Sequence, residues 1–173
     1  MNTHLKEIYA VTLPEPITRA RVAFLIQERR IDPAIAAIDL GMVKRKLQDA
    51  EEGKGWSADQ CDEHEVAYKR YLHLCKLHGK GMVPTKDVDE FWHQHIMDTR
   101  AYQNDCQEAI GHFVHHFPYL GMRGEEDERQ LEKAFRRTEK LYCDAFGEAL
   151  LPSVGAQCWH DCSGRCWNDC SSK

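Results

Sequence analysis

The chain has 173 residues, of which 42% are hydrophobic and 29% charged, and its formal net charge is -5. This length allows one domain with a sizeable core, and the composition excludes a disordered or membrane-embedded chain. The negative charge and the scattered arginines and lysines argue against a polyanionic partner. We therefore expect a folded domain that binds neither nucleic acid nor membrane.

The first residues, MNTHLKEIYAVTLPEP, lack a basic segment followed by an uninterrupted apolar stretch. The sequence also has no run of about 18 apolar residues, the length needed to cross a bilayer. We expect a cytoplasmic protein. Its C-terminal tail, residues 158–173, could be exported after cleavage. In a reducing compartment, closely spaced cysteines indicate metal binding, redox chemistry or modification more than standing disulfides.

The first two predicted helices lie on either side of an Asp-Pro pair. Apolar residues at helical spacing predict a helix from Thr18 to Arg30. Asp32 is then expected as N-cap and Pro33 as the first residue of a second helix, which continues to about Ala50.

Three longer helices are predicted after Gly53-Lys54-Gly55. Ser57 and Gln60 have the spacing of a capping box, so a third helix should run from there to His78-Gly79. A fourth should follow Pro84-Thr85 and continue without a break to Gly111. A fifth should extend from Gly124 to Phe146 and end at Gly147.

The sequence has no segment that alternates in polarity for long enough to predict a strand. The fold class is therefore predicted to be all-α, with a single helical domain of five or six helices in residues 1–150. Residues 151–157 contain a proline and a glycine without periodicity and are predicted to be a linker. Residues 158–173 are predicted to form a flexible Cys-rich tail.

The fourth predicted helix, with the sequence that follows it, carries a family resemblance. The stretch VDEFWHQHIMDTRAYQNDC, followed by GHFVHHFPYLGMRG, resembles bacterial members of the glycine-rich domain-containing protein-like family. The resemblance extends from about Ile38 to Gly147. Its matching residues are Val88, Asp89, Trp92, His93, His95, Asp98, Thr99, Tyr102, Asp105, Cys106, Gly111, His115, His116, Pro118, Tyr119 and Gly121. The family name implies no particular activity, and in this chain cysteine and tryptophan stand where relatives have glycine-rich sequence.

Histidines and an aspartate in the same region form the first candidate site. His93 and His95 are two residues apart, so on an undistorted helix they point in nearly opposite directions and cannot chelate one ion. Asp98, one turn after His95, is expected to accept a hydrogen bond from its imidazole. One interpretation is a polar network that holds the helix against the loop containing His115 and His116.

A second interpretation joins one of His93 and His95 with His115 or His116 and an aspartate in a zinc or iron site. A third is that His95 and Asp98 face a cleft and take part in catalysis. The sequence leaves these interpretations open. The positions of Cys61, Cys75, Cys106 and Cys143 on predicted helices indicate packing more than reactivity.

The tail is the second candidate site, because it repeats itself. Residues 158–165 and 166–173 both begin with the pattern C-W-x-D-C-S. The positions that could be modified or bind metal are Cys158, Cys162, Cys166 and Cys170, and those that could be crosslinked are Trp159, Asp161, Trp167 and Asp169. If the two tryptophans packed on the surface of the domain, that would explain why the tail contains them, but it would not explain the four cysteines.

The tail resembles the core region of precursors of ribosomally synthesised, post-translationally modified peptides. That resemblance implies a peptide-modifying enzyme as partner, of a radical or iron-dependent kind, and a domain that serves for recognition. We therefore expect a non-enzymatic scaffold that presents its tail as a substrate and requires no cofactor. The alternatives are a protein that binds Zn²⁺ or Cu⁺ through the unmodified tail thiolates, or a metalloenzyme that uses the histidines.

Overall fold

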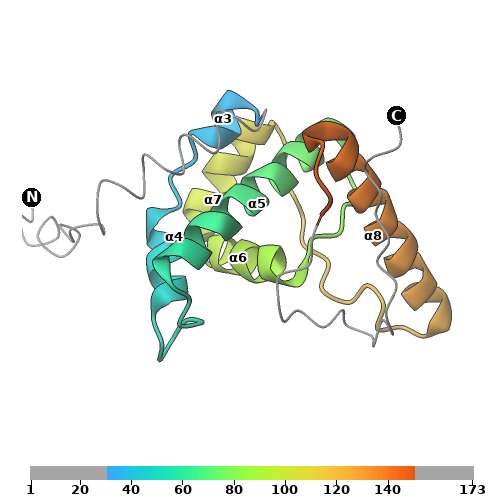
Figure 1. The fold of residues 1–173 in the computed structure, drawn as a ribbon, viewed down its shortest axis with the longest axis horizontal. Coiled ribbons are helices and arrows are strands. Elements are labelled where there is room, and N and C mark those ends of the chain that lie inside the picture. Colours follow the sequence, from blue (N-terminus) through green and yellow to red (C-terminus); the bar gives the residue numbers. More distant parts are fainter. Residues whose placement is uncertain (1–30, 151–173) are drawn as a thin grey trace, which may run out of the picture.

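A computed structural model describes residues 31–150, and in this part of the chain the fold is helical without any strand (Figure 1). The all-α prediction is therefore confirmed for these residues. The elements are α3 (Pro33–Ala36), α4 (Gly41–Gln48), α5 (Ala58–His78), α6 (Lys86–Met97), α7 (Thr99–Asp105), the π-helical segment η1 (Cys106–Ile110) and α8 (Glu125–Phe146). The helix predicted from Thr18 to Arg30, the linker 151–157 and the tail 158–173 lie outside the described residues.

Helix α5 is the centre of the domain. It contacts α3, α4, α6, η1 and α8, and both its ends have the predicted signals. The capping box is present, because the Ser57 side chain accepts from the Gln60 backbone and the Gln60 side chain accepts from the Ser57 backbone. Leu72 and Leu74 are completely enclosed by the core, at 1% and 0% exposure. Packing on several sides explains why apolar residues occur around most of this helix.

The single helix predicted from Pro33 to Ala50 is wrong, since the structure divides it into α3 and α4. Asp32 does cap α3 as expected, with its side chain accepting from the Ala34 backbone. The chain then leaves the helix after Ala36, and the two following apolar residues, Ile38 and Leu40, are both buried. A continuous helix would point Leu40 well away from Ile38, so the break allows both side chains to reach the core.

The helix predicted from Pro84 to Gly111 is also interrupted. Asp98 has non-helical backbone angles, ends α6 and caps α7 by accepting a hydrogen bond from the Ala101 backbone at 3.2 Å. The last turn then widens into η1 before Gly111, at a φ of 91°, ends it as predicted. Aspartate favours caps over helix interiors, because its side chain bonds to nearby backbone groups, and here that preference divides the helix.

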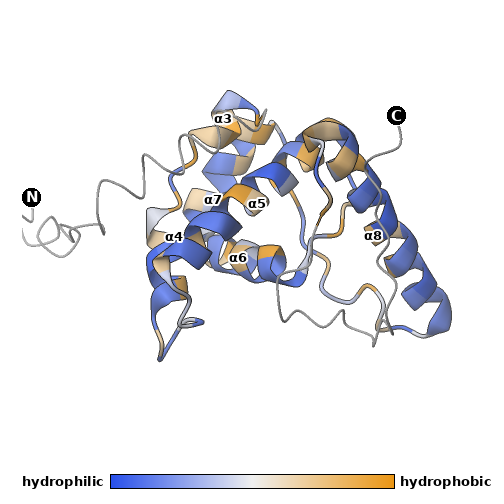
Figure 2. Ribbon diagram, viewed as in Figure 1, coloured by the Kyte–Doolittle hydropathy of each residue, from blue (hydrophilic) through white to orange (hydrophobic). Residues whose placement is uncertain are grey.

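Helix α8 was predicted correctly and is the most peripheral of the helices. Figure 2 shows it hydrophilic over much of its length, with apolar residues towards its C-terminal end. Its buried residues are Asp127, Thr138 and Tyr142, and it packs on α5. None of the helices in residues 31–150 is long and apolar enough to cross a membrane. Between η1 and α8 lies an irregular loop, residues 111–124, which carries part of the site described next.

Candidate metal centre

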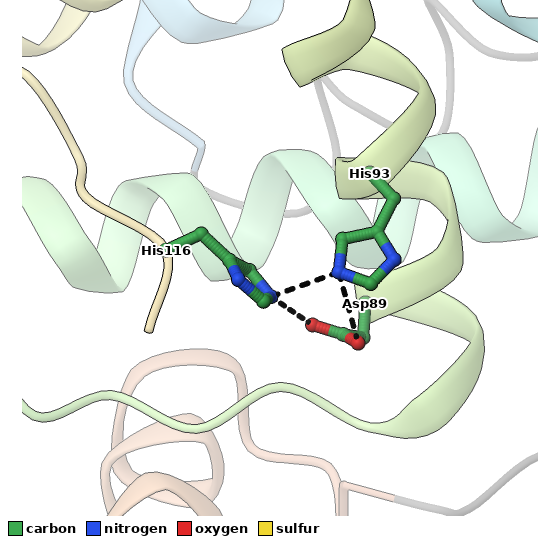
Figure 3. A group of neighbouring side chains, drawn as sticks. All are labelled: Asp89, His93 and His116. Carbon is green, nitrogen blue, oxygen red and sulfur yellow. Dashed lines mark hydrogen bonds and ion pairs between the residues drawn. The ribbon is translucent and has the colours of Figure 1, made fainter. Parts of the chain in front are cut away.

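Three side chains from two segments converge on one point (Figure 3). Asp89 and His93 are four residues apart on α6 and so project from the same face of the helix, one turn apart. His116 comes from the loop 111–124 and points between them. Its Nε2 lies 2.9 Å from Asp89 Oδ1 and 3.0 Å from His93 Nε2, and His93 Nε2 lies 3.5 Å from Asp89 Oδ2.

These separations are the ones that ligands of a common metal ion have. Imidazole nitrogens and carboxylate oxygens bind Zn²⁺ at about 2.0–2.2 Å, so two ligands at octahedral or tetrahedral angles are about 2.8–3.6 Å apart. The three contacts, at 2.9, 3.0 and 3.5 Å, match that range without rearrangement. Two histidines with one carboxylate are also a ligand set that zinc and non-haem iron sites use.

Hydrogen bonding alone satisfies this cluster poorly. A neutral imidazole nitrogen carries either a proton or a lone pair, and an ionised carboxylate only accepts. If His116 Nε2–H donates to Asp89, the His93 nitrogen at 3.0 Å either competes for the same proton or, in the other tautomer, faces it with a second N–H. Neither tautomer of His93 satisfies all three contacts, whereas a cation would receive a lone pair from each group.

The cluster lies at the surface, with one side open. The exposed fraction of the side chain is 43% for His93, 24% for Asp89 and 16% for His116. A structural zinc site is closed by four protein ligands, whereas a site with three keeps a position for water or another ligand. The arrangement therefore suits an ion that binds one further group.

Buried aromatic residues support the ligands from behind. Trp92, next to His93 on α6, contacts the His116 ring with 4.7 Å between ring centroids. The Trp92 indole N–H donates to the Tyr102 hydroxyl at 2.8 Å, and that hydroxyl donates to the Val114 carbonyl. This chain of hydrogen bonds ties the loop to α6 and α7 two residues before His116 and so limits where the imidazole can go.

The far end of the loop is held by the first turn of α8. The Asp127 carboxylate accepts hydrogen bonds from the backbone N–H groups of Gly121 and Arg123, at 2.6 and 3.2 Å. Arg123 also forms an ion pair with it, at 2.5 Å, and this bond lowers the pKa of Asp127. Hydrogen bonds therefore hold both ends of the loop, at Val114 and at Gly121 and Arg123.

Comparison with known proteins places this domain in a family. A family described as UCP032817-like matches residues 40–154, which is more than half of the chain. The chain belongs to the UCP032817-like family. It is also 30% identical over 90 residues to the glycine-rich domain-containing protein 1 of Arabidopsis thaliana, which supports the resemblance seen in the sequence. That alignment covers 49% of this chain and only 11% of the plant protein, and no solved structure matches.

His95 does not join the cluster of this UCP032817-like domain. It is 2% exposed, and its two ring nitrogens contact the Tyr68 hydroxyl at 2.9 Å and the Asp105 carboxylate at 3.0 Å. The expected hydrogen bond to Asp98 is wrong, because the helix break makes Asp98 the cap of α7. Burial lowers the pKa of His95, and the Asp105 carboxylate offsets part of that effect.

Of the other histidines predicted for this site, two lie in the cluster and one does not. His93 and His116 are brought together, whereas His115 is exposed and its ring contacts Phe113. Asp89 was recognised as a residue of the family resemblance but not as a candidate ligand. The signal that could have found it is its spacing to His93, since a carboxylate and an imidazole at i and i+4 share a helix face.

Three cysteines of the UCP032817-like domain are packing residues, as predicted, whereas Cys143, for which packing was also predicted, is disulfide-bonded. Cys61, Cys75 and Cys106 are buried and free, at 0%, 2% and 2% exposure. Burial raises the pKa of Cys61 to about 11 and that of Cys75 to about 12. Such thiols stay protonated at neutral pH and are poor nucleophiles. The eight tail positions named above lie outside the described residues.

Proposed function

We propose that this domain is a metal-binding module that holds one divalent transition-metal ion, of the zinc or iron(II) class, through Asp89, His93 and His116. The convergence of three ligand atoms within 2.9–3.5 Å of one another is the observation that supports it. The family resemblance adds no activity to this proposal. It develops the interpretation that one of His93 and His95 joins a loop histidine and an aspartate.

The chain's own residues supply both the position and the charge of the site. Asp89 brings one negative charge, while the two imidazoles must be unprotonated to donate their lone pairs. Trp92 and the Tyr102–Val114 hydrogen bond hold the His116 ring in place. Bound metal would act as a Lewis acid at the open position, where a water or a thiol could be the further ligand.

The test is calorimetric titration of the full chain with Zn²⁺, in a background where the four tail cysteines are replaced by serine. This background removes the competing thiols and isolates the histidine site. We expect one ion per chain, and Asp89→Asn or His116→Ala should weaken binding by more than the roughly 10–100-fold that loss of an outer-shell partner causes. His115→Ala is the matched control, because it removes an exposed histidine next to the site.

Unchanged affinity in the Asp89→Asn and His116→Ala chains would show that the metal is held elsewhere. Equal losses in the His115→Ala chain would point to general histidine binding at the surface instead of this cluster. Circular dichroism of each variant at matched concentration would show that the helical fold is retained.

A second function is favoured by the repeated C-W-x-D-C-S pattern of the tail. We propose, as the alternative, that the protein is a non-enzymatic scaffold whose tail is modified by a peptide-modifying enzyme of a radical or iron-dependent kind. The cysteines, tryptophans and aspartates recur at matching positions of both units, which metal binding by thiolates alone does not explain. A substrate repeated on one tether can be presented unit by unit to one active site.

Intact and fragment masses of protein isolated from its own host test this alternative. The protein is isolated without reductant and then treated with a chelator. Mass changes confined to residues 158–170 that survive the chelator would support a modified substrate. An unmodified tail peptide would remove the alternative and leave metal binding as the function.

A further inference from the structure

The three donors of the metal cluster lie on one side of the ion that they would hold. At a metal–ligand distance of about 2.1 Å, neighbouring octahedral ligands are about 3.0 Å apart and opposite ones about 4.2 Å. The imidazole nitrogens of His93 and His116 are 3.0 Å apart, and the Asp89 oxygens lie 2.9 Å from His116 and 3.5 Å from His93. Each pair is closer than opposite ligands would be. The three side chains therefore occupy one face of an octahedron.

The two shortest contacts favour six ligands around the ion over four. Tetrahedral ligands at the same bond length would be about 3.4 Å apart. Only the contact between His93 and Asp89, at 3.5 Å, is that long, whereas both contacts of His116 are at 3.0 Å or less. Two histidines and one carboxylate on a single face are also the ligand set of non-haem iron(II) sites. Such a face leaves three further positions, each adjacent to the other two.

The protein covers the cluster from the inside and leaves its outer side to solvent. The Trp92 ring, 3% exposed, lies 4.7 Å from the His116 ring, whereas the His93 side chain is 43% exposed and that of Asp89 24%. Within residues 31–150, no further histidine, cysteine, aspartate or glutamate joins the group. A small molecule from solution can therefore approach the ion from the side of His93.

Charge and spacing together select the chemistry of such a molecule. One carboxylate and two neutral imidazoles leave a divalent ion with a net charge of +1, which a singly charged anion cancels. Oxygen donors suit iron(II) in this ligand set. A carboxylate with a second oxygen donor on the next carbon closes a five-membered ring with the metal. It fills two adjacent positions, and once one oxygen is bound the other is held beside the ion at a high effective concentration.

Building on the proposed metal-binding function, we infer that Asp89, His93 and His116 hold iron(II) for a small chelating oxygen anion. The ligand is a carboxylate with an oxygen donor on the adjacent carbon, as in a 2-oxo acid, and it binds through one carboxylate oxygen and that second oxygen. The carboxylate is already ionised at neutral pH, and its two oxygens displace two waters. Binding therefore requires no oxidant, reductant or proton acceptor, and a water molecule keeps the third position.

Pyruvate is the probe, because it is the smallest 2-oxo acid and carries little beyond the two donor groups. The test uses the full chain with its four tail cysteines replaced by serine, loaded with Fe²⁺ in the absence of oxygen. Chelation of iron(II) by a 2-oxo acid gives a visible metal-to-ligand charge-transfer band, which should saturate at one pyruvate per chain. Propionate has the same carbon skeleton without the oxo group. It should give no band and should compete with pyruvate on the order of 10²-fold more weakly.

Variants of the cluster locate the chelate. Asp89→Asn and His116→Ala should abolish the band, whereas His115→Ala, the matched control, should keep it. A band that survives in the Asp89→Asn and His116→Ala chains would place the iron chelate elsewhere and overturn the inference.

The remaining outcomes separate this inference from the proposed function. If the chain binds Fe²⁺ but pyruvate gives no band, or propionate competes equally well, the metal site stands and the chelating ligand is wrong. Binding of Zn²⁺ in calorimetry without binding of Fe²⁺ would lead to the same conclusion. If the chain binds neither ion, the proposed function itself is wrong.

Discussion

His95 lies between two partners that fix its tautomer. The Asp105 carboxylate can only accept, so Nε2 of His95 carries the proton and donates to it. The Tyr68 hydroxyl must then donate to the unprotonated Nδ1. The imidazole is 2% exposed and lies against the Tyr68 and Tyr102 rings. Protonation of Nδ1 would therefore bury a charge and would break the hydrogen bond that Nδ1 accepts from Tyr68.

The lowered pKa of His95 predicts a pH dependence of stability. An unfolded histidine titrates near 6.5, whereas the buried imidazole in the folded state accepts a proton only at lower pH. Between these two values the unfolded chain binds more protons, so the free energy of unfolding should fall as the pH drops below about 6.5. Urea unfolding at about pH 7.5, 6.5 and 5.5, with a chelator present, measures this slope.

Replacing the imidazole isolates its part of that slope. In the His95→Gln chain the free energy of unfolding should change less between about pH 7.5 and 5.5 than in the unaltered chain. Burial also lowers the pKa values of His64 and His73, and these residues are present in both chains, so their contributions cancel in the comparison. Parallel slopes in the two chains would contradict the assignment to His95.

Gly121 is the glycine of loop 111–124 at which a side chain would meet both an unfavourable backbone conformation and a close neighbour. Its φ is 91°, and a Cβ built there would lie 2.6 Å from Leu131 Cδ2 on α8. Gly121→Ala should therefore lose about 1–2 kcal/mol from the backbone conformation alone, with a further loss from displacing Leu131. Gly147→Ala is the matched control, since it has a φ of 71° and no atom within 4 Å of such a Cβ. Urea unfolding should find Gly121→Ala the less stable of the two.

At the scale of whole elements, the sequence predicts best where local signals decide. The ends of α5 follow from Ser57, Gln60 and Gly79, all of which act within one turn of the helix, and the ends of α8 follow from two glycines in the same way. The break after Ala36 depends instead on which side chains reach the core, and the break at Asp98 depends on that aspartate capping a new helix. Helical periodicity alone continues through both places, so it could not reveal them.

The same break decides which aspartate serves the candidate site. On a continuous helix Asp98 would follow His95 by one turn, and that geometry made it the natural partner in the sequence. In the structure the chain turns at Asp98, so Asp105 takes its place beside His95 and Asp89 faces His93 and His116. His93 and His116 could be anticipated as residues of one group. The spacing of Asp89 to His93 was visible in the sequence, whereas the pairing of Asp89 with His116 required the position of the loop.

Asp98→Ala tests whether Asp98 only caps α7 or also contributes to metal binding. Loss of an N-cap aspartate costs about 1 kcal/mol, because the Ala101 backbone N–H loses its acceptor. The free energy of unfolding should fall by about that amount, while Zn²⁺ affinity in calorimetry stays within about threefold of the unaltered chain. A loss of affinity as large as that of Asp89→Asn would mean that Asp98 is a ligand after all.

Over the whole molecule, charged residues within the core connect the first three described helices. Glu65 on α5 forms ion pairs with Lys69 one turn on, at 2.8 Å, and with Lys44 of α4, at 2.6 Å. Lys44 also contacts Asp62, and Lys69 donates to the carbonyl of Ala36 at the end of α3. Two positive and two negative charges thus balance one another at buried or nearly buried positions, and their contacts hold α3 and α4 against α5.

This balance predicts that removing one charge is worse than removing two. Glu65→Met leaves Lys69, whose side chain is 3% exposed, as a buried cation without its carboxylate, and should cost about 3–5 kcal/mol of unfolding free energy. Adding Lys69→Met removes the stranded charge while Lys44 keeps Asp62, so the double variant should regain part of that loss in spite of its second substitution. Urea unfolding of the three chains measures both differences. A double variant less stable than the single one would show that Lys69 stabilises the domain chiefly through its bond to Ala36 and not by neutralising Glu65.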